Sequence, residues 1–278
     1  MSVGSSSSSE GRGRTALITG ASSGIGRATA EALVARGYRV LGTSRDPGAM
    51  PASARAASVE YFALDLGDRD SVEARALALP RIDVLVNNAG ESQVGALEEL
   101  PEEAVRRLFE LNVLAPVRLT QLLLPGMRRQ GYGRVVMVGS MLGSSPLAFR
   151  SSYGASKAAI RAFADGCRHE LSPFGVWVTT VEPGAIRTGI SARRTRYLAE
   201  GSPYAEGYRT VLSSLDANEA KGIPAERVAK TIVGAIEAER PRPLYAVGSA
   251  APLAFAMQRL FPRSVSERIV ARRHGLHV

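Results

Sequence analysis

The sequence predicts an α/β fold in which one doubly wound parallel β-sheet is covered by helices on both faces. Short runs of β-branched and aliphatic residues alternate with longer amphipathic stretches along most of the chain. The strand-like runs are almost continuously apolar, as expected where both faces of a sheet are buried. No shift in composition, long linker or internal repeat divides residues 15–250, so we expect a single domain.

The expected elements alternate along the chain. Strands are predicted at residues 15–20, 38–44, 59–66, 82–90, 133–140 and 175–184. Helices are predicted at about residues 25–36, 69–78, 101–129, 152–172 and 224–239. In such sheets ligands bind at the carboxyl ends of the strands, close to the point where the strand order reverses. Motifs that carry chemistry are therefore expected directly after strands.

The composition is that of a globular protein. The chain has 278 residues, of which 45% are hydrophobic, so it can bury a substantial core. Residues 1–13 are mostly Ser and Gly and are expected to be a disordered tail ahead of a domain at 14–278. No stretch approaches the roughly 20 apolar residues of a membrane span or the apolar core of a signal peptide, so we expect a cytoplasmic protein without membrane association. Cys167 is the single cysteine, which agrees with a reducing compartment.

The net charge of +9 does not indicate a nucleic-acid partner. Arginines are spread over many predicted helices and concentrate at 187–196 and 259–273, without interleaved aromatic residues or a nucleic-acid-binding motif. An anionic small molecule would use the positive charge equally well. The histidines at 169, 274 and 277 have no cysteine or acidic cluster at ligand spacing, so no metal site is predicted.

The stretch "TGASSGIG" at residues 19–26 links the first predicted strand to the first predicted helix. Gly20, Gly24 and Gly26 permit a tight turn and let the backbone approach a pyrophosphate. Free N–H groups and the positive end of the helix that begins near Ile25 would then face the phosphates. Plain strand-to-helix turns also favour glycine, but the position after the first strand favours a dinucleotide-binding fold.

Four motifs together resemble the short-chain dehydrogenase/reductase family, in its single-domain branch. They are "TGASSGIG" at 19–26, "NNAG" at 87–90, "YGASK" at 153–157 and "PGAIRT" at 183–188, and the resemblance covers about residues 14–248. It implies a Rossmann-like fold and an oxidoreductase that acts on CH–OH groups with a nicotinamide cofactor. We also expect a homodimer or a homotetramer.

The edge of the second predicted strand indicates NADP(H) rather than NAD(H). An NAD site usually has an Asp or Glu there for the ribose hydroxyls, whereas "LGTSRDP" places Arg45 at that edge and Asp46 after it. A guanidinium suits a 2′-phosphate, and Ser22 or Ser23 in the glycine loop can add a hydrogen bond. Arg45 can equally be a solvated loop residue, and a register shift of one residue would bring Asp46 into play.

After the third predicted strand, the resemblance implies that Asp65 and Leu66 form an edge and a face of an adenine site. Asp65 can equally cap the helix that follows. The resemblance also places other residues along the cofactor and near its nicotinamide. These are Asn88, Ala89 and Gly90 of "NNAG", and Pro183, Gly184, Ile186 and Thr188 of "PGAIRT". Glu91 departs from the family, which commonly has a small or apolar residue here; it can line the pocket or bind the serine-rich loop.

Tyr153 and Lys157 are four residues apart in a predicted helix, so both side chains lie on one face. Hydride transfer to a ketone creates an alkoxide that must be protonated as it forms. An adjacent ammonium favours the phenolate that the reverse reaction needs. The resemblance assigns Tyr153 as the acid/base, and Lys157 as its electrostatic partner and a ligand of the nicotinamide ribose. Taken alone, such a pair is more often an exposed helix face.

Ser140 and Asn112 complete the predicted catalytic set. Ser140 ends a predicted strand at a spacing before Tyr153 that matches the family, and its hydroxyl can orient the substrate oxygen. Asn112 lies four residues before Pro116, which has no N–H to donate to the carbonyl of residue 112. The resemblance implies that this carbonyl holds a water that links Lys157 to solvent. A serine in a turn can also merely bond backbone, and a simple proline kink gives the same geometry at Asn112.

Residues 189–222 lack the periodicity of the core and resemble the substrate lid of the family, with a helical piece. Arg193, Arg194 and Arg196 in this segment can meet an anionic substrate or stay solvated. The C-terminal extension at about 249–278 mixes apolar and basic residues and resembles the C-terminal helices of steroid- and retinol-active members. It can instead cover the core, join a partner subunit or rest on an anionic membrane surface.

We therefore expect an NADP(H)-dependent oxidoreductase that transfers a hydride between nicotinamide and a carbonyl or secondary alcohol of a lipophilic, steroid- or retinoid-like molecule. A ketoreductase of acyl thioesters is the alternative within the enzyme class. A non-catalytic NADPH-binding regulator is the alternative outside it, because a fold does not determine a function. The predicted catalytic set favours the enzyme, since a sensor has no need of a proton relay.

Overall fold

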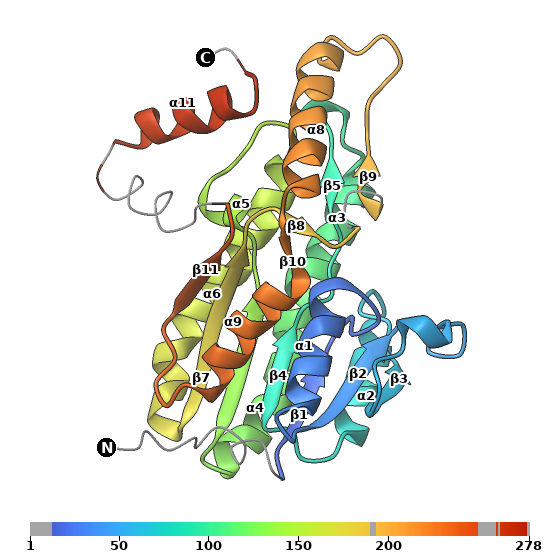
Figure 1. Cartoon of the computed structure of the whole chain (residues 1–278), viewed down its shortest axis with the longest axis vertical. Coiled ribbons are helices and arrows are strands. Elements are labelled where there is room, and N and C mark those ends of the chain that lie inside the picture. The colour runs from blue at the N-terminus through green and yellow to red at the C-terminus, as the bar shows by residue number, and fades with distance from the viewer. Residues whose placement is uncertain (1–12, 190–192, 250–259, 261, 277–278) are drawn as a thin grey trace.

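A seven-stranded parallel β-sheet forms the centre of the protein, in the order β11-β7-β6-β4-β1-β2-β3 (Figure 1). The structure is a computed structural model of the chain and describes residues 13–189, 193–249, 260 and 262–276. The strands are β1 Thr15–Ile18, β2 Arg39–Ser44, β3 Val59–Ala63, β4 Val84–Asn87, β6 Gly133–Val138, β7 Val176–Pro183 and β11 Leu244–Val247. The predicted doubly wound α/β fold is confirmed. All but the last residue of the expected tail, 1–13, lies outside the described residues.

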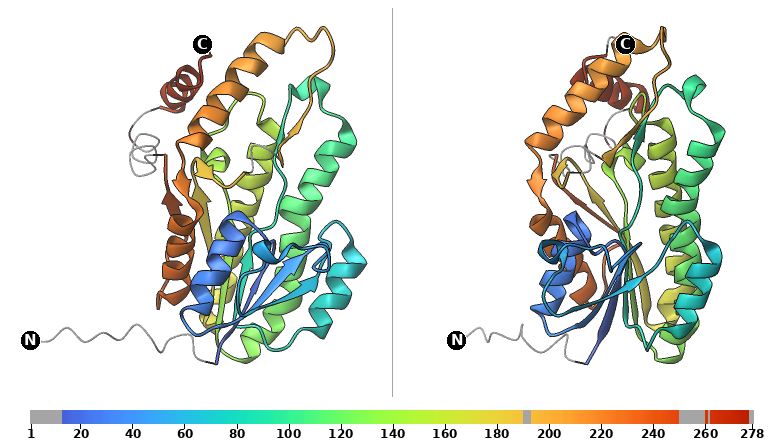
Figure 2. Two further views of the ribbon diagram at one scale, coloured as in Figure 1. Left: turned by 45° about the vertical axis from the view of Figure 1, so that its right-hand side comes forward. Right: turned by 90° about the vertical axis from the view of Figure 1, so that its right-hand side faces the viewer.

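Helices cover both faces of this sheet (Figure 2). One face carries α1 (Gly24–Val34) and α9 (Ala225–Glu237), whose apolar side chains pack on it. The opposite face carries α2 (Arg69–Ala78), α4 (Ala115–Arg129) and α6 (Ser151–Leu171). Each helix lies where the apolar periodicity predicts one, with small shifts at its ends.

The continuous apolar character of the strands follows from their burial on both faces. In β1, Ala16 and Ile18 pack with α1 and α9, whereas Leu17 between them packs with the helices of the other face. β1 pairs with β2 on one side and with β4 on the other, so the strand order reverses next to β1. The carboxyl ends of these strands therefore meet at the edge where a ligand site is expected.

The helix predicted at 101–129 is interrupted. α3 (Glu102–Phe109) passes through a π-helical turn at Glu110–Leu114 into α4, and the Ala115 N–H donates to the Glu110 carbonyl five residues back. Pro116 follows this turn in the continuous helix and has no N–H to donate to the Asn112 carbonyl. Such π turns occur frequently at functional sites, and this one contains Asn112.

Smaller elements lie beyond the carboxyl ends of the strands or connect the main elements (Figure 1). They are β5 Gln93–Val94, α5 Met141–Ser144, β8 Ile186–Arg187, β9 Thr195–Arg196, α8 Ala205–Ala220, β10 Ile223–Pro224 and α11 Arg263–Arg273, with short 3-10 turns at Ala52–Ala54, Leu97–Glu99 and Ser172–Phe174. β5 pairs with β9, and β8 pairs with β10. The described part of the expected lid, 193–222, therefore contains β9 and α8. Within the described ranges no helix is both long and apolar enough to cross a membrane.

Candidate active site

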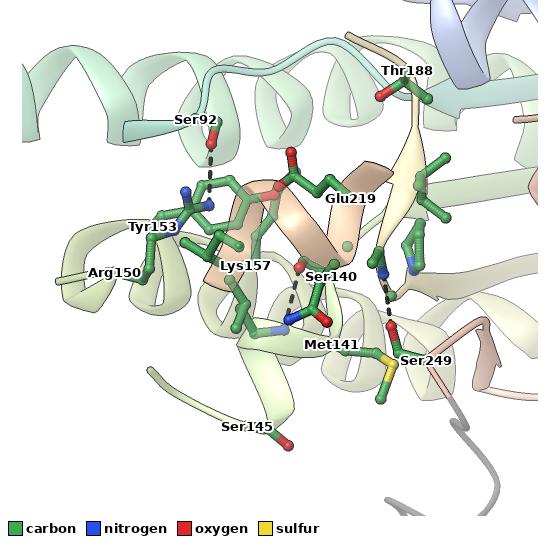
Figure 3. Close-up of a pocket in the computed structure, with 18 of the residues that line it drawn as sticks. Ser92, Ser140, Met141, Ser145, Arg150, Tyr153, Lys157, Thr188, Glu219 and Ser249 are labelled. Atoms are coloured by element: carbon green, nitrogen blue, oxygen red, sulfur yellow. Dashed lines mark hydrogen bonds between the residues drawn. The ribbon is translucent and has the colours of Figure 1, made fainter. Parts of the chain in front are cut away.

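A cavity of about 260 Å³ lies at the carboxyl ends of the central strands (Figure 3). Its walls come from the segments that follow β4, β6 and β7, from the first turns of α6, and from α8 and α11. The cavity brings together many of the predicted site residues. These are Asn88, Gly90, Ser140, Tyr153, Lys157, Pro183, Gly184, Ile186 and Thr188. The predicted adenine and phosphate residues lie outside this cavity.

Tyr153 and Lys157 lie one turn apart on α6, and both side chains are buried. The Lys157 Nζ donates to the Val138 carbonyl at 2.9 Å and lies 5.9 Å from the centre of the Tyr153 ring. Small residues let α5 pack close to this helix, because a Cβ on Gly143 would lie 2.9 Å from the Lys157 carbonyl carbon. The two side chains therefore share one desolvated environment at the cavity wall.

Ser140 lies directly after β6 and caps the short helix α5. Its hydroxyl oxygen accepts the Leu142 N–H at 3.2 Å. The alternative that this serine bonds backbone in a turn is therefore confirmed. The same side chain also lines the cavity, as Tyr153 does. A hydroxyl oxygen that accepts from the backbone keeps its own proton for a further partner.

The Asn112 side chain is held by a backbone peptide segment after β4. Its Oδ1 accepts the Glu91 N–H at 2.8 Å, and its Nδ2 donates to the Glu91 carbonyl at 3.0 Å and to the Ser156 hydroxyl at 3.1 Å. A Cβ on Gly90 would lie 2.7 Å from Asn112 Oδ1 and 3.7 Å from Lys157 Nζ. Asn112 Oδ1 and Lys157 Nζ therefore both lie close to the Cα of Gly90, although Asn112 itself is not among the residues that line the cavity.

The glycine loop has the conformation that its sequence predicts. Gly20 and Gly24 have φ of 67° and 53°, which favours glycine. A Cβ on Gly26 would lie 2.3 Å from the Gly20 carbonyl oxygen, so only glycine fits there. Asn88 Nδ2 donates to the Thr19 carbonyl at 2.9 Å and ties the loop to the end of β4. The loop is thus a preformed cradle of backbone at the start of α1.

The residues predicted for the adenosine end lie at the ends of β2 and β3. Arg45 is exposed, and no hydrogen bond or ion pair of its side chain is found among the described residues. Asp46 is used locally, because its Oδ1 accepts the Ala49 N–H at 3.1 Å. The Leu66 side chain is buried in the core, so only its backbone is available to a nucleotide.

The capping alternative for Asp65 is wrong. The N-cap of α2 is Asp68, whose Oδ1 accepts the N–H groups of Asp70 at 3.0 Å and Ser71 at 3.3 Å. Asp65 instead accepts the Gly67 N–H at 2.9 Å in a turn before the helix. An aspartate three residues closer to the helix performs the capping, because only a side chain at that position reaches the free N–H groups.

The segment after β7 carries the residues predicted for the nicotinamide end. A Cβ on Gly184 would lie 2.3 Å from the Ser249 Oγ, which accepts the Ala185 N–H at 2.8 Å. Thr188 lines the cavity and also approaches the glycine loop, since a Cβ on Gly24 would lie 3.2 Å from the Thr188 Cβ. Thr188 therefore marks the place where the cavity and the glycine loop meet.

Arg150 is a cavity residue that the sequence did not single out. Only 4% of this residue is exposed, and its Cζ lies 4.3 Å from the centre of the Tyr153 ring. Nη2 donates to the Ser92 hydroxyl at 3.1 Å, whereas Nε and Nη1 have no hydrogen-bond partner among the described residues. Burial lowers the pKa of Arg150 to about 10. No motif in the sequence marks an arginine at this position, because its burial depends on segments distant in the chain.

Glu182 is a second buried ionisable residue that the sequence did not single out. It lies on β7, and its Oε2 accepts the Ser144 hydroxyl at 2.7 Å. The Arg161 Nη1 lies 3.6 Å from its other oxygen. Burial raises the pKa of the Glu182 carboxyl. The contact anchors the end of α5, the helix that Ser140 begins.

The arginines of the expected lid differ from one another. Arg194 is buried and pairs with Asp216 at 2.9 Å and with Glu219 on α8, so it is neither solvated nor free to meet a substrate. Arg193 is exposed and donates to the Thr188 carbonyl at 3.4 Å. Arg196 lies 3.8 Å from Asp216 with an exposed side chain. Arg194 thus holds the lid together from inside.

Comparison with known proteins agrees with this fold. The family model described as short chain dehydrogenase matches residues 14–198. A short-chain dehydrogenase from Streptomyces avermitilis, whose crystal structure is known, is 36% identical, with a TM-score of 0.79 over 94% of this chain and 96% of that one. A short-chain dehydrogenase from Sphingobium yanoikuyae, solved in complex with NADPH, is 29% identical, with a TM-score of 0.70 over 90% of this chain and 97% of that one.

The name of one relative states an enzymatic activity. The 3-ketodihydrosphingosine reductase of Bacteroides thetaiotaomicron is 30% identical over 86% of this chain and 90% of its own length. The family model matches well over half of the chain. The Streptomyces avermitilis enzyme shares the fold at 36% identity. The protein belongs to the short-chain dehydrogenase family of oxidoreductases.

Proposed function

We propose that this oxidoreductase uses NADP(H) to interconvert a carbonyl group and a secondary alcohol in a lipophilic small molecule. The observation that carries the proposal is the pair of buried side chains Tyr153 and Lys157 on one face of α6, at the wall of a cavity that Ser140 also lines. An acid beside an ammonium in such a place suits proton transfer to a substrate oxygen. When bound, the nicotinamide supplies or accepts the hydride.

The residues present fit a dinucleotide. Gly20 and Gly24 have the positive φ of a tight turn, and Gly26 lets the start of α1 pack close to this loop, because a Cβ there would collide with the Gly20 carbonyl. Thr188 joins this cradle to the cavity, so a ligand that spans both has its reactive end beside Tyr153. Arg45 favours NADP(H), because an exposed guanidinium at the end of β2 can pair with a 2′-phosphate.

Three side chains have assigned parts in proton transfer. Tyr153 gives its proton to the carbonyl oxygen during reduction and takes it back during oxidation, and Lys157 stabilises the phenolate between these events. Ser140 orients the substrate oxygen through the hydroxyl proton that its capping contact leaves available. Asn112, in its π turn, provides a carbonyl that holds a water on the path from Lys157 to solvent.

The cavity wall supports a lipophilic substrate. Apolar side chains come from α5, α8 and α11, namely Met141, Leu142, Leu215, Ile269 and Val270. The C-terminal extension thus contributes to the wall through α11, while its residues 250–259 lie outside the described part. The relative from Bacteroides thetaiotaomicron is named for a long-chain ketone, which agrees with this wall. A homodimer or homotetramer stays a prediction.

The test measures NADPH and NADH oxidation at 340 nm against hydrophobic ketones, steroids, aldehydes and β-keto thioesters. We expect turnover of a lipophilic ketone that Tyr153→Phe abolishes while NADPH still binds. The matched control is Tyr245→Phe on β11, whose hydroxyl accepts the Arg242 N–H and which is not among the residues that line the cavity. Turnover confined to β-keto thioesters would make the protein an acyl-thioester ketoreductase. Tight NADPH binding without turnover of any compound would support a regulator.

A further inference from the structure

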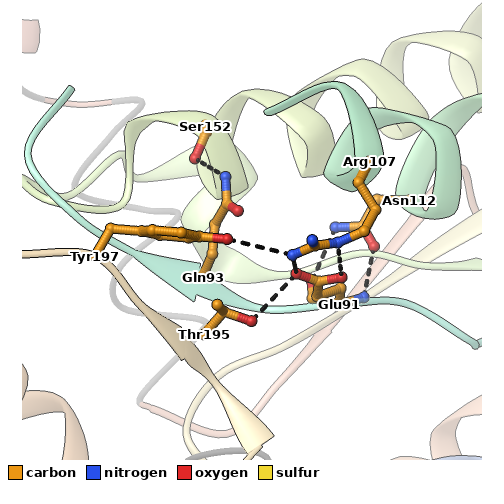
Figure 4. A network of polar contacts seen from close by, with 7 residues as sticks. All are labelled: Glu91, Gln93, Arg107, Asn112, Ser152, Thr195 and Tyr197. Atoms are coloured by element: carbon orange, nitrogen blue, oxygen red, sulfur yellow. Dashed lines mark hydrogen bonds and ion pairs between the residues drawn. The ribbon is translucent and has the colours of Figure 1, made fainter. Parts of the chain in front are cut away.

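We propose that Glu91 is a positioning residue that links the docked lid strand β9 to the orientation of Asn112. The inference rests on the proposed function, in which Asn112 belongs to the proton relay. Glu91 takes part in two sets of contacts at once: its backbone holds Asn112, and its carboxylate holds Arg107 and the lid (Figure 4). Glu91 follows "NNAG" directly in the chain.

The backbone of Glu91 fixes the Asn112 carboxamide at both ends. The Glu91 N–H donates to Oδ1 at 2.8 Å, and the Glu91 carbonyl accepts from Nδ2 at 3.0 Å. The same Nδ2 reaches Ser156, which immediately precedes Lys157 on α6. A shift of the Glu91 backbone would therefore move Asn112 and the π turn that carries its carbonyl.

The carboxylate of Glu91 ties α3 to the lid. Arg107 makes a two-pronged contact, Nη2 to Oε1 at 2.7 Å and Nε to Oε2 at 3.0 Å. The Thr195 hydroxyl of β9 donates to the same Oε1 at 3.3 Å, and Arg107 Nη2 reaches the Tyr197 hydroxyl at 3.3 Å. Two-pronged arginine–carboxylate contacts fix direction as well as distance. The strand β9 therefore contacts a carboxylate that Arg107 already holds in position.

Backbone pairing keeps the lid in register with this carboxylate. The Thr195 N–H donates to the Ser92 carbonyl at 3.0 Å, and the Tyr197 N–H donates to the Val94 carbonyl at 2.9 Å. Ser92 and Val94, which supply these carbonyls, belong to the short segment that follows Glu91 in the chain. Undocking of β9 therefore removes both backbone and side-chain restraints from the segment that holds Asn112.

Charge balance explains why the carboxylate is paired here. The Glu91 side chain is only 18% exposed, and it lies on the same cavity wall as Tyr153 and Lys157. An unpaired negative charge there would oppose formation of the phenolate. Arg107, half-exposed at 50%, cancels that charge, and the contact with Glu91 raises the pKa of the guanidinium. The half-exposed guanidinium leaves the pair in contact with solvent, so its contribution to stability is small and positioning is the role that it fits.

The test compares both ends of the link in the Tyr153-dependent assay. Glu91→Ala removes the carboxylate, and Thr195→Val removes one lid contact while keeping the branched shape. We expect Glu91→Ala to lower kcat by about tenfold to a hundredfold, because a misplacement of about 1 Å at a catalytic group has an effect of this size. NADPH affinity, measured by fluorescence titration, should stay unchanged because the glycine loop is not touched.

A neighbouring ion pair on α3 supplies the matched control. Arg106 pairs with Glu102 at the helix surface, with side chains 76% and 69% exposed. Arg106→Met removes an arginine adjacent to Arg107 without touching the lid, so kcat should stay at the wild-type value. Arg107→Met should lower kcat, because it leaves the Glu91 carboxylate unpaired beside the catalytic pair.

Two readouts separate positioning from a merely structural role. The solvent deuterium isotope effect on kcat should rise in Glu91→Ala, since a displaced relay makes proton transfer slower. The double variant of Glu91→Ala with Thr195→Val should lose less than the product of the single losses, because both act through one contact. Thermal unfolding verifies that each variant is folded. If Glu91→Ala does not fold, Thr195→Val and Arg107→Met decide by the same criteria.

The outcomes that overturn the inference are distinct from failure of the proposed function. Wild-type kcat and isotope effect in Glu91→Ala, with Tyr153→Phe inactive, would reject the role of Glu91 and leave the enzyme assignment intact. Equal losses in Arg106→Met and Arg107→Met would reject it as well. Absence of any Tyr153-dependent turnover in the wild type would remove the proposed function and, with it, this inference.

Discussion

The Arg150 guanidinium lies over the Tyr153 ring, with its Cζ 4.3 Å from the ring centre, and is closer to that ring than Lys157 Nζ at 5.9 Å. Tyr153 therefore has two cations beside it. Both are buried, so their attraction for a developing phenolate is only weakly screened by solvent. Glu219 on α8 and Arg194 in the lid are the other charges that act on Arg150.

Loss of the charge at position 150 should shift the pH dependence of alcohol oxidation. Arg150→Met removes a cation that lies over the Tyr153 ring, so the pH profile of oxidation should move toward higher pH. Arg150→Lys keeps a cation and should stay close to wild type. Steady-state rates between pH 6 and 10 measure the shift. If the pH profiles of Arg150→Met and Arg150→Lys were superimposable, the arginine would act through packing and not through its charge.

Cofactor preference should depend on Arg45. Arg45→Asp removes a partner for the 2′-phosphate and adds repulsion, so NADPH should bind about tenfold to a hundredfold more weakly relative to NADH, as expected for a lost charge-assisted hydrogen bond. Fluorescence titration with both cofactors measures the ratio. Arg75→Asp, on the exposed surface of α2, is the control and should leave the ratio unchanged. An unchanged ratio in Arg45→Asp would place the phosphate site elsewhere.

A methyl group at Gly90 should damage the active site specifically. In Gly90→Ala the new Cβ would lie 2.7 Å from Asn112 Oδ1, and Asn112 cannot retreat easily because three hydrogen bonds hold its carboxamide. We expect kcat to fall by about tenfold or more. Gly234→Ala is the opposite case, since nothing lies within 4 Å of its Cβ on α9. That change should stabilise the protein by up to about 1 kcal/mol and leave kcat unchanged.

Glu182 should make the free energy of unfolding fall as pH rises. Burial raises the pKa of its carboxyl in the folded protein, so the folded state holds this proton more tightly than the unfolded state. The free energy of unfolding that Glu182 contributes therefore falls as pH rises from the ordinary range of a glutamate through the raised folded value. Glu182→Gln lacks this titration.

Urea unfolding between pH 4 and 8 measures that effect. The stability of Glu182→Gln relative to wild type should increase as pH rises and then level off. A difference that is constant with pH, or that moves in favour of wild type as pH rises, would contradict the raised pKa. Activity should be measured in parallel, because the carboxylate also anchors α5 through Ser144.

Local patterns in the chain were enough to predict the sheet, its helices and much of the site. Strands buried on both faces must be apolar along their whole length, and helices must show an apolar stripe, so both can be read without knowledge of the partners. The glycines of the loop and the four-residue spacing of Tyr153 and Lys157 are equally local, since backbone conformation and helix geometry alone place them.

Only the tertiary structure decided contacts between distant segments. Arg150 is buried because Ser92 and the Tyr153 ring meet it, and Glu91 finds Thr195 over a hundred residues further along the chain. A charged side chain can be solvated, paired or buried. Which of these occurs depends on the segments that the fold packs against it. The sequence therefore determined the scaffold and the placement of Tyr153 and Lys157 on one helix face, whereas packing decided which charges surround that pair.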